Sequence, residues 1–73
     1  MREYKVRVNR AEVLLIMVRR NMSHQDVARR SKLSLGHWYN LINGHKTAGP
    51  ETRDRIQTVF NNVAWDRLFK IDE

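Results

Sequence analysis

Two asparagines lie three residues apart in the segment 34–44, which reads SLGHWYNLING. An asparagine side chain donates and accepts at once, so it can bond an adenine edge bidentately or hold a phosphate oxygen. Asn40 and Asn43 are therefore the leading candidates for contact with nucleic acid. The alternative is that both are solvated helix residues, and that Asn43 only ends a helix before Gly44.

The spacing of apolar residues predicts that this segment is a short helix. Trp38, Leu41 and Ile42 recur every three to four residues and should form its buried face. Ser34 can cap the helix, which we expect to run to about Asn43. Trp38 could in principle stack on an unpaired base, but its spacing with the two aliphatic residues favours a place in the core.

The opposite face of the predicted helix is polar and uncharged, which suits the edges of base pairs in a major groove. The residues expected to read bases are Ser34, Leu35, Gly36, His37, Tyr39 and Asn40. Leu35 and Tyr39 could meet thymine methyl groups. Gly36 would let the backbone approach DNA closely.

A second short helix should precede this one along the chain. Ser23 can cap it, Val27 and Ala28 give it a small apolar side, and residues 30–33 break the pattern as a turn. The side chains expected to hold phosphates are His24, Arg29, Lys32, Asn43, His45 and Lys46. Any single charge on a small surface is more often just solvated, so the prediction of phosphate contacts depends on the helices that carry these residues.

Residues 13–69 resemble the helix-turn-helix of the Cro/phage-repressor family, which is also described as XRE-like or lambda-repressor-like. The matching positions are Ser23, Ala28, Leu33, Trp38 and the pair Asn43-Gly44. Three positions depart from the family pattern: His24 stands for the usual Gln, Lys32 for the usual turn Gly, and Trp38 for a branched aliphatic residue. The resemblance implies sequence-specific binding of double-stranded DNA by a repressor-like transcriptional regulator of the phage or mobile-element type.

The remaining segments complete an expected all-α bundle of about five short helices with a small terminal β ribbon. Residues 4–8 alternate apolar and basic side chains like a strand, and residues 69–72 alternate again and could pair with them. Between them, Asn9 and Glu12 form a capping pair for a first helix that should run to about Arg20. Its apolar run at 13–18 needs cover from the N-terminal strand, the C-terminal segment or a partner subunit.

Two further helices are predicted after the segment 45–49, which reads as a loop. Pro50 suits the first position of the fourth helix, which should end at Asn61-Asn62. Its buried stripe would be Ile56, Val59 and Phe60. Residues 64–69 predict a fifth helix with Trp65, Leu68 and Phe69 turned inward.

Length and charge point to one small basic domain spanning residues 1–73. Residues 1–50 hold ten Lys and Arg against three Asp and Glu, a balance of +7, whereas residues 51–73 have a balance of −1. The positive charge therefore belongs to the part that contains the predicted helix-turn-helix, as expected if that part faces phosphates. A soluble domain with a merely basic surface explains the charge alone about as well.

Several function classes find no support in the sequence. There is no cysteine, the three histidines are thirteen and eight residues apart, and no nucleophile elbow, phosphate loop or glycine fingerprint occurs. We therefore expect no catalytic residue, no metal, no cofactor and no small-molecule ligand. The run at 13–18 is too short to cross a membrane and residues 1–3 do not begin a signal peptide, so we expect a cytoplasmic, nucleoid-associated protein.

Three functions remain open at this point. The first is transcriptional regulation by a protein that binds DNA as a homodimer on a roughly palindromic site. The second is an architectural or recombination-accessory DNA-binding protein. The third is an antitoxin-like interaction module that uses the apolar run at 13–18 to hold a protein partner.

Overall fold

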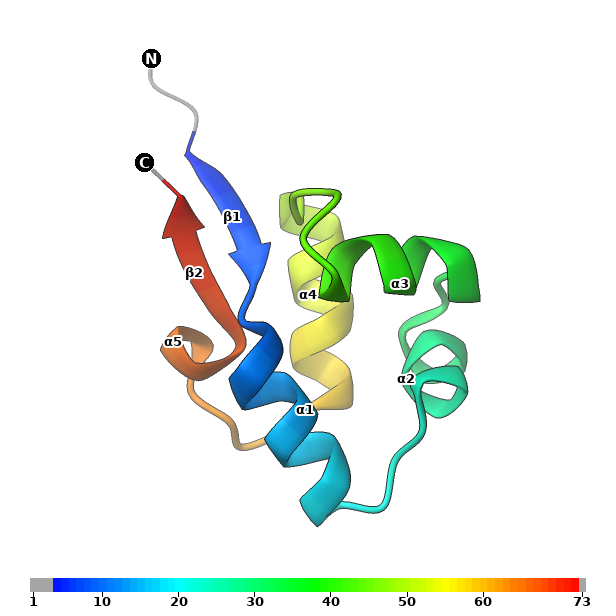
Figure 1. Cartoon of the computed structure of the whole chain (residues 1–73). Helices are drawn as coiled ribbons and strands as arrows, with labels where there is room; N and C mark the ends of the chain where they lie inside the picture. Colours follow the sequence, from blue (N-terminus) through cyan, green and yellow to red (C-terminus); the bar gives the residue numbers. More distant parts are fainter. Residues whose placement is uncertain (1–3, 73) are drawn as a thin grey trace.

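The computed structural model describes residues 4–72; residues 1–3, on which the signal-peptide expectation rests, and residue 73 lie outside the described part. The elements in chain order are β1 (Lys5–Val8), α1 (Arg10–Arg19), α2 (His24–Ser31), α3 (Leu35–Ile42), α4 (Pro50–Val59), α5 (Trp65–Leu68) and β2 (Phe69–Asp72) (Figure 1). The prediction of about five helices and a terminal β ribbon is confirmed for these residues.

The ends of the described chain pair with each other as an antiparallel ribbon. The register sets Lys5 opposite Asp72 and Val8 opposite Phe69. Because side chains alternate along a strand, Val6 and Val8 face the core at 3% exposure while their neighbours face outward. The alternation of residues 4–8 predicted this strand.

All five helices and the inner face of the β ribbon contribute side chains to one apolar core. The largest fully buried side chains are Trp38, Phe60 and Phe69, and they are surrounded by aliphatic residues from all the helices. Ile56 is also fully buried, whereas Val59 only packs against the edge of the cluster. The core position of Trp38 is confirmed. The predicted α4 stripe is confirmed for Ile56 and Phe60, but the helix ends at Val59, before the predicted Asn61-Asn62, and Val59 is only half-buried.

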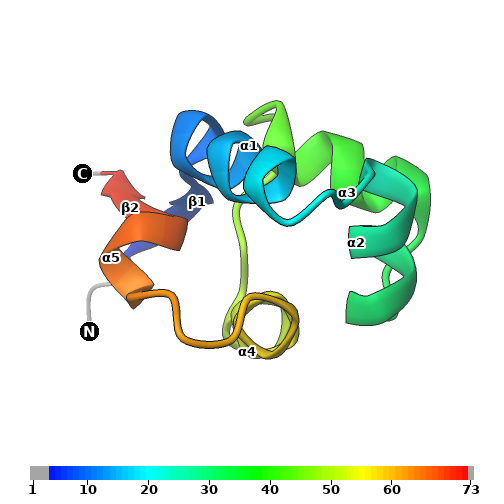
Figure 2. The same ribbon diagram turned by 90° about the horizontal axis from the view of Figure 1, so that it is seen from below.

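The molecule is elongated, and different elements form its two ends. The ribbon and α5 lie at one end and α2 lies at the other, with α1, α3 and α4 between them (Figures 1 and 2). The described part measures 39 × 23 × 19 Å along its principal axes. Figure 2, which looks along the axis of α4, shows that α4 lies on the opposite side of the molecule from α1.

The expected capping pair at the start of α1 is wrong. Asn9 is the N-cap residue, but its side chain makes no capping hydrogen bond. The Glu12 carboxylate instead accepts from Nε and Nη2 of Arg67, at 3.3 and 3.0 Å. Both N–H groups of Arg67, which lies on α5, converge on one oxygen of this carboxylate, Oε2, so the Glu12 side chain is turned toward α5 rather than toward the Asn9 backbone.

Three other expectations need correction. The fifth helix is only the single turn Trp65–Leu68, because Phe69 already begins β2. Helix α2 continues through Ser31, so the turn before α3 is Lys32–Leu33–Ser34 rather than residues 30–33. The apolar run of α1 is covered only in part, and Leu15 and Val18 remain 42% and 73% exposed. Each helix within residues 4–72 is too short or too polar to span a bilayer.

Candidate nucleic-acid interface

Helices α2 and α3 each begin with a serine cap. Ser23 Oγ accepts from the Asp26 N–H at 3.1 Å, and the Asp26 carboxylate accepts from the Ser23 N–H at 3.0 Å. Ser34 Oγ accepts from the His37 N–H at 3.1 Å. These bonds satisfy N–H groups that lack partners within the helix, so the sequence itself defines where both helices start. Both predicted caps are confirmed.

The backbone hydrogen bond from Ser23 lowers the pKa of Asp26 most, and the bond from the Ser23 hydroxyl lowers it further. Asp26 also pairs with Arg29 at 2.9 Å. Arg29 is one of the predicted phosphate ligands, and its side chain is still 72% exposed. An exposed pair of this kind contributes little to stability and leaves the guanidinium able to exchange partners.

A three-residue turn sets the angle between α2 and α3. Lys32 adopts the left-handed conformation, with φ 60° and ψ 34°, as expected where it stands in place of a glycine. Its carbonyl accepts from Arg55 Nη1 of α4 at 3.3 Å. The Ser31 hydroxyl, which is buried, donates to the Val27 carbonyl at 2.6 Å. The turn is therefore held by a hydrogen bond within α2 and by another from α4.

Helix α3 presents two clearly different faces. Trp38, Leu41 and Ile42 are 0–2% exposed and pack into the core. On the opposite face Gly36 is exposed and Asn40 is half-buried. The other predicted base-reading residues, Ser34, Leu35, His37 and Tyr39, are exposed or half-buried around this face. The outer face thus carries no charge, in agreement with its reading from the sequence.

A ring cluster joins the two helices beside this face. The Trp38 indole N–H donates to His24 Nδ1 at 2.9 Å. The His24 ring also lies 5.2 Å from the Tyr39 ring, measured between centroids. Because an indole can only donate, Nδ1 carries no proton in this bond, and Nε2 is the donor that His24 keeps for another group. His24 therefore links α2 to α3 through this bond.

The other predicted phosphate ligands lie at the two ends of α3. Lys32 is exposed in the turn before the helix, and Asn43, His45 and Lys46 are exposed after it. The N–H groups of His45 and Lys46 donate to the Asn40 carbonyl at 2.8 and 3.1 Å. Those bonds fold the loop back over the last turn of α3. Gly44 has φ 80°, as predicted for the residue that ends this helix.

Arg7 is a residue of this region that the sequence did not single out. Its Nε pairs with Asp72 at 2.8 Å, and its Nη1 donates to the Gly44 carbonyl at 2.6 Å. The side-chain bond from Arg7, followed by its charge, lowers the pKa of Asp72. The alternation of residues 4–8 did place Arg7 on the outer face of the strand. Nothing local indicated that it would reach a carbonyl 37 residues away.

Within 4–72 no three His, Asp or Glu side chains gather in a way that could hold a metal ion. Comparison with protein-family models, with curated proteins and with solved structures gave no match.

Proposed function

We propose that this chain binds double-stranded DNA sequence-specifically through the α2–α3 unit and acts as a repressor-like transcriptional regulator. The observation that carries the proposal is the outer face of α3, which is exposed, polar and uncharged while cations stand at both ends of the helix. The likeness of residues 13–69 to the Cro/phage-repressor pattern supports the same function.

The size of α3 fits the task. An α-helix with its side chains is about 10–12 Å in diameter and a major groove is about 12 Å wide, so the eight residues of α3 can lie along the groove for about 12 Å. Asn40 is proposed to bond an adenine edge, and Tyr39 and Leu35 to contact thymine methyl groups. Gly36 faces open space: a Cβ added there would meet nothing within 4 Å. The free protein therefore gives no steric reason for a glycine at this position, whereas close approach to DNA does.

Phosphate contacts are proposed to hold α3 in register with the groove. Lys32 and His24 would grip one side of the groove, and Asn43, His45 and Lys46 the other. Such contacts carry little sequence information, but they orient the helix that does. The proposed dimer would place two copies of α3 one helical turn apart, about 34 Å, on a roughly palindromic site.

Selection of bound sequences from a random duplex library tests the proposal. An enriched motif of a few base pairs per half-site is expected. Titration of that motif between about 50 and 200 mM salt should then give a steep loss of affinity, about 0.9 log units per log unit of salt for each phosphate neutralised. A library that enriches nothing at low salt would contradict the proposal.

Protein–protein contact is the second candidate, and a specific observation favours it. Leu15 and Val18 lie one turn apart on α1 and are 42% and 73% exposed. An apolar pair of this kind suits a partner helix, as in the antitoxin-like alternative. Binding to another protein that resists high salt, together with no DNA preference, would favour this candidate. Architectural or recombination-accessory binding remains the alternative within DNA binding, and would show as affinity without an enriched motif.

A further inference from the structure

The outer face of the β ribbon is strongly basic. The register places Arg7 directly opposite Lys70, and Lys5 opposite Asp72, all four on the face turned away from the core. Asp72 is already paired with Arg7. Two cations directly opposite each other on neighbouring strands destabilise a ribbon. The Arg7–Asp72 ion pair offsets part of this repulsion, whereas Lys70 and Lys5 make no side-chain ion pair among residues 4–72 and remain exposed.

The ribbon is fixed to the loop that follows α3. Arg7 donates to the Gly44 carbonyl at 2.6 Å, and the Ala48 N–H donates to the Val6 carbonyl at 2.7 Å. Figure 1 shows β1 beside this loop and beside the C-terminal end of α3. The basic face therefore continues the surface on which His45 and Lys46 lie, rather than forming a separate patch at the far side of the molecule.

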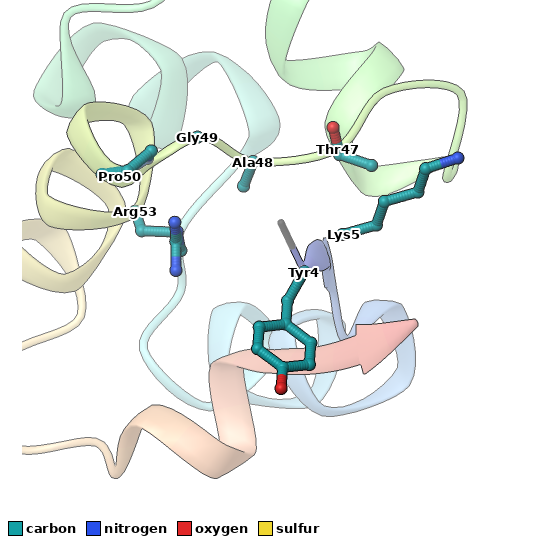
Figure 3. Close-up of a pocket in the computed structure, with 7 residues that line it drawn as sticks. All are labelled: Tyr4, Lys5, Thr47, Ala48, Gly49, Pro50 and Arg53. Atoms are coloured by element: carbon teal, nitrogen blue, oxygen red, sulfur yellow. The ribbon is translucent and has the colours of Figure 1, made fainter. Parts of the chain in front are cut away.

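A hollow of about 580 Å³ opens between β1 and the start of α4. Tyr4, Lys5, Arg53 and residues 47–50 line it (Figure 3). Lys5 and Arg53 are its charged residues, and no carboxylate lines it. Arg53 Nε is buried without a hydrogen-bond partner among the described residues. A buried guanidinium N–H that lacks an acceptor is costly, so Arg53 brings to the wall of the hollow a hydrogen-bonding capacity that the described residues leave unused.

We propose that the outer face of the β ribbon and this hollow form a second phosphate-binding surface, which holds the DNA backbone beside the segment that α3 reads. This inference rests on the proposed function. Lys5 and Lys70 lie on an open strand face, and Arg53 lies in the hollow beside it. Because the three come from both strands of the ribbon and from α4, an extended chain of phosphates suits them better than a single small anion. A free phosphate in the hollow is the other source of the same chemistry.

The test compares two double variants that each remove two exposed cations. Lys5→Gln with Lys70→Gln removes the ribbon cations. Arg10→Gln with Arg19→Gln is the matched control on α1, because neither arginine makes an ion pair or side-chain hydrogen bond within residues 4–72. Each variant is titrated on the selected duplex over a range of salt concentrations, and circular dichroism checks that it is folded.

The ribbon variant should lower the salt slope by roughly 1.8 units for each bound chain, and the control should change it little. The ribbon variant and the control variant should keep the base preferences of the wild type. Ethylation interference should show phosphates that matter to the wild type and to the control but not to the ribbon variant. Arg53→Gln should weaken binding to all duplexes by a similar factor.

Three outcomes separate the possibilities. If the wild type binds no duplex, the proposed function itself fails. If the wild type binds and the ribbon variant behaves like the control, only the second surface is refuted. If inorganic phosphate shifts the NMR signals of Arg53 at millimolar concentration while the ribbon and Arg53 variants bind DNA normally, the hollow serves a free anion and the proposal is overturned.

Discussion

Trp38 joins the two helices of the α2–α3 unit by packing and by one hydrogen bond. Its side chain is fully buried, and its indole N–H has His24 as acceptor. Trp38→Ala should cost about 3–5 kcal/mol, which a domain of this size cannot spare. We expect the variant to be unfolded by circular dichroism at room temperature. A folded Trp38→Ala protein that merely fails to bind DNA would mean that α3 has been assigned the wrong buried face.

Gly36 allows stability and binding to be separated at one position. Alanine favours a helix interior over glycine by roughly 1 kcal/mol, and a Cβ at this position meets nothing within 4 Å. Gly36→Ala should therefore raise the free energy of unfolding by about 0.5–1 kcal/mol in urea titrations. The same variant should weaken binding to the selected duplex, because in the proposed complex the added methyl group stands between the α3 backbone and the DNA. Unchanged affinity would remove Gly36 from the interface.

Single residues show how far local patterns predict structure. Ser23 and Ser34 were predicted as caps because a cap needs only the residues that follow it within three positions. Asn9 and Glu12 have the same spacing, yet Glu12 is taken by Arg67 from 55 residues away. The contact of Arg7 with Gly44 is of the same long-range kind. Local sequence therefore predicted the caps and the buried face of the α2–α3 unit but missed the contacts that attach the ribbon to it.

At the scale of elements, α2 depends on a charged capping box that acid should weaken. The pKa of Asp26 is lower in the folded protein than its ordinary value, so its contribution to stability is present above about pH 4 and is lost as the pH falls through the lowered pKa. Asp26→Asn should be less stable than the wild type at neutral pH, and the difference should shrink below pH 4.

Urea unfolding at a series of pH values checks this prediction. Asp54→Asn is the matched control, because Asp54 is an exposed carboxylate on α4. The difference in free energy of unfolding between Asp54→Asn and the wild type should not shrink below pH 4 as that of Asp26→Asn does. A gap between wild type and Asp26→Asn that stays constant down to pH 2 would show that the carboxylate charge is not what caps α2.

Element boundaries were predicted well where glycine, proline or serine marks them, as at Ser34, Gly44 and Pro50. They were predicted less well where packing decides. Residues 64–69 have a helical pattern, but Phe69 pairs with Val8 in the ribbon and shortens α5 to four residues. The apolar run at 13–18 is a second example: it predicted a helix covered on both faces, but Leu15 and Val18 remain exposed.

The whole molecule is expected to work on DNA as two copies. One eight-residue helix contacts only a few base pairs, and two copies one turn apart multiply the specificity. Footprinting should therefore show a roughly palindromic site, and sedimentation at saturation should give two chains per duplex. One short asymmetric site saturated by a single chain would refute the dimer while leaving DNA binding intact.

The central claim is that the outer face of α3 reads bases while the cations around it hold phosphates. The most direct test compares Asn40→Ala with Lys46→Ala on the selected site and on single-base variants of it. Asn40→Ala should lose about 1–3 kcal/mol on the best site and relax the preference at one or two positions. Lys46→Ala should weaken all sequences about equally and lower the salt slope by roughly one unit. If Asn40→Ala lowers affinity uniformly across the variants, α3 does not read DNA with this face.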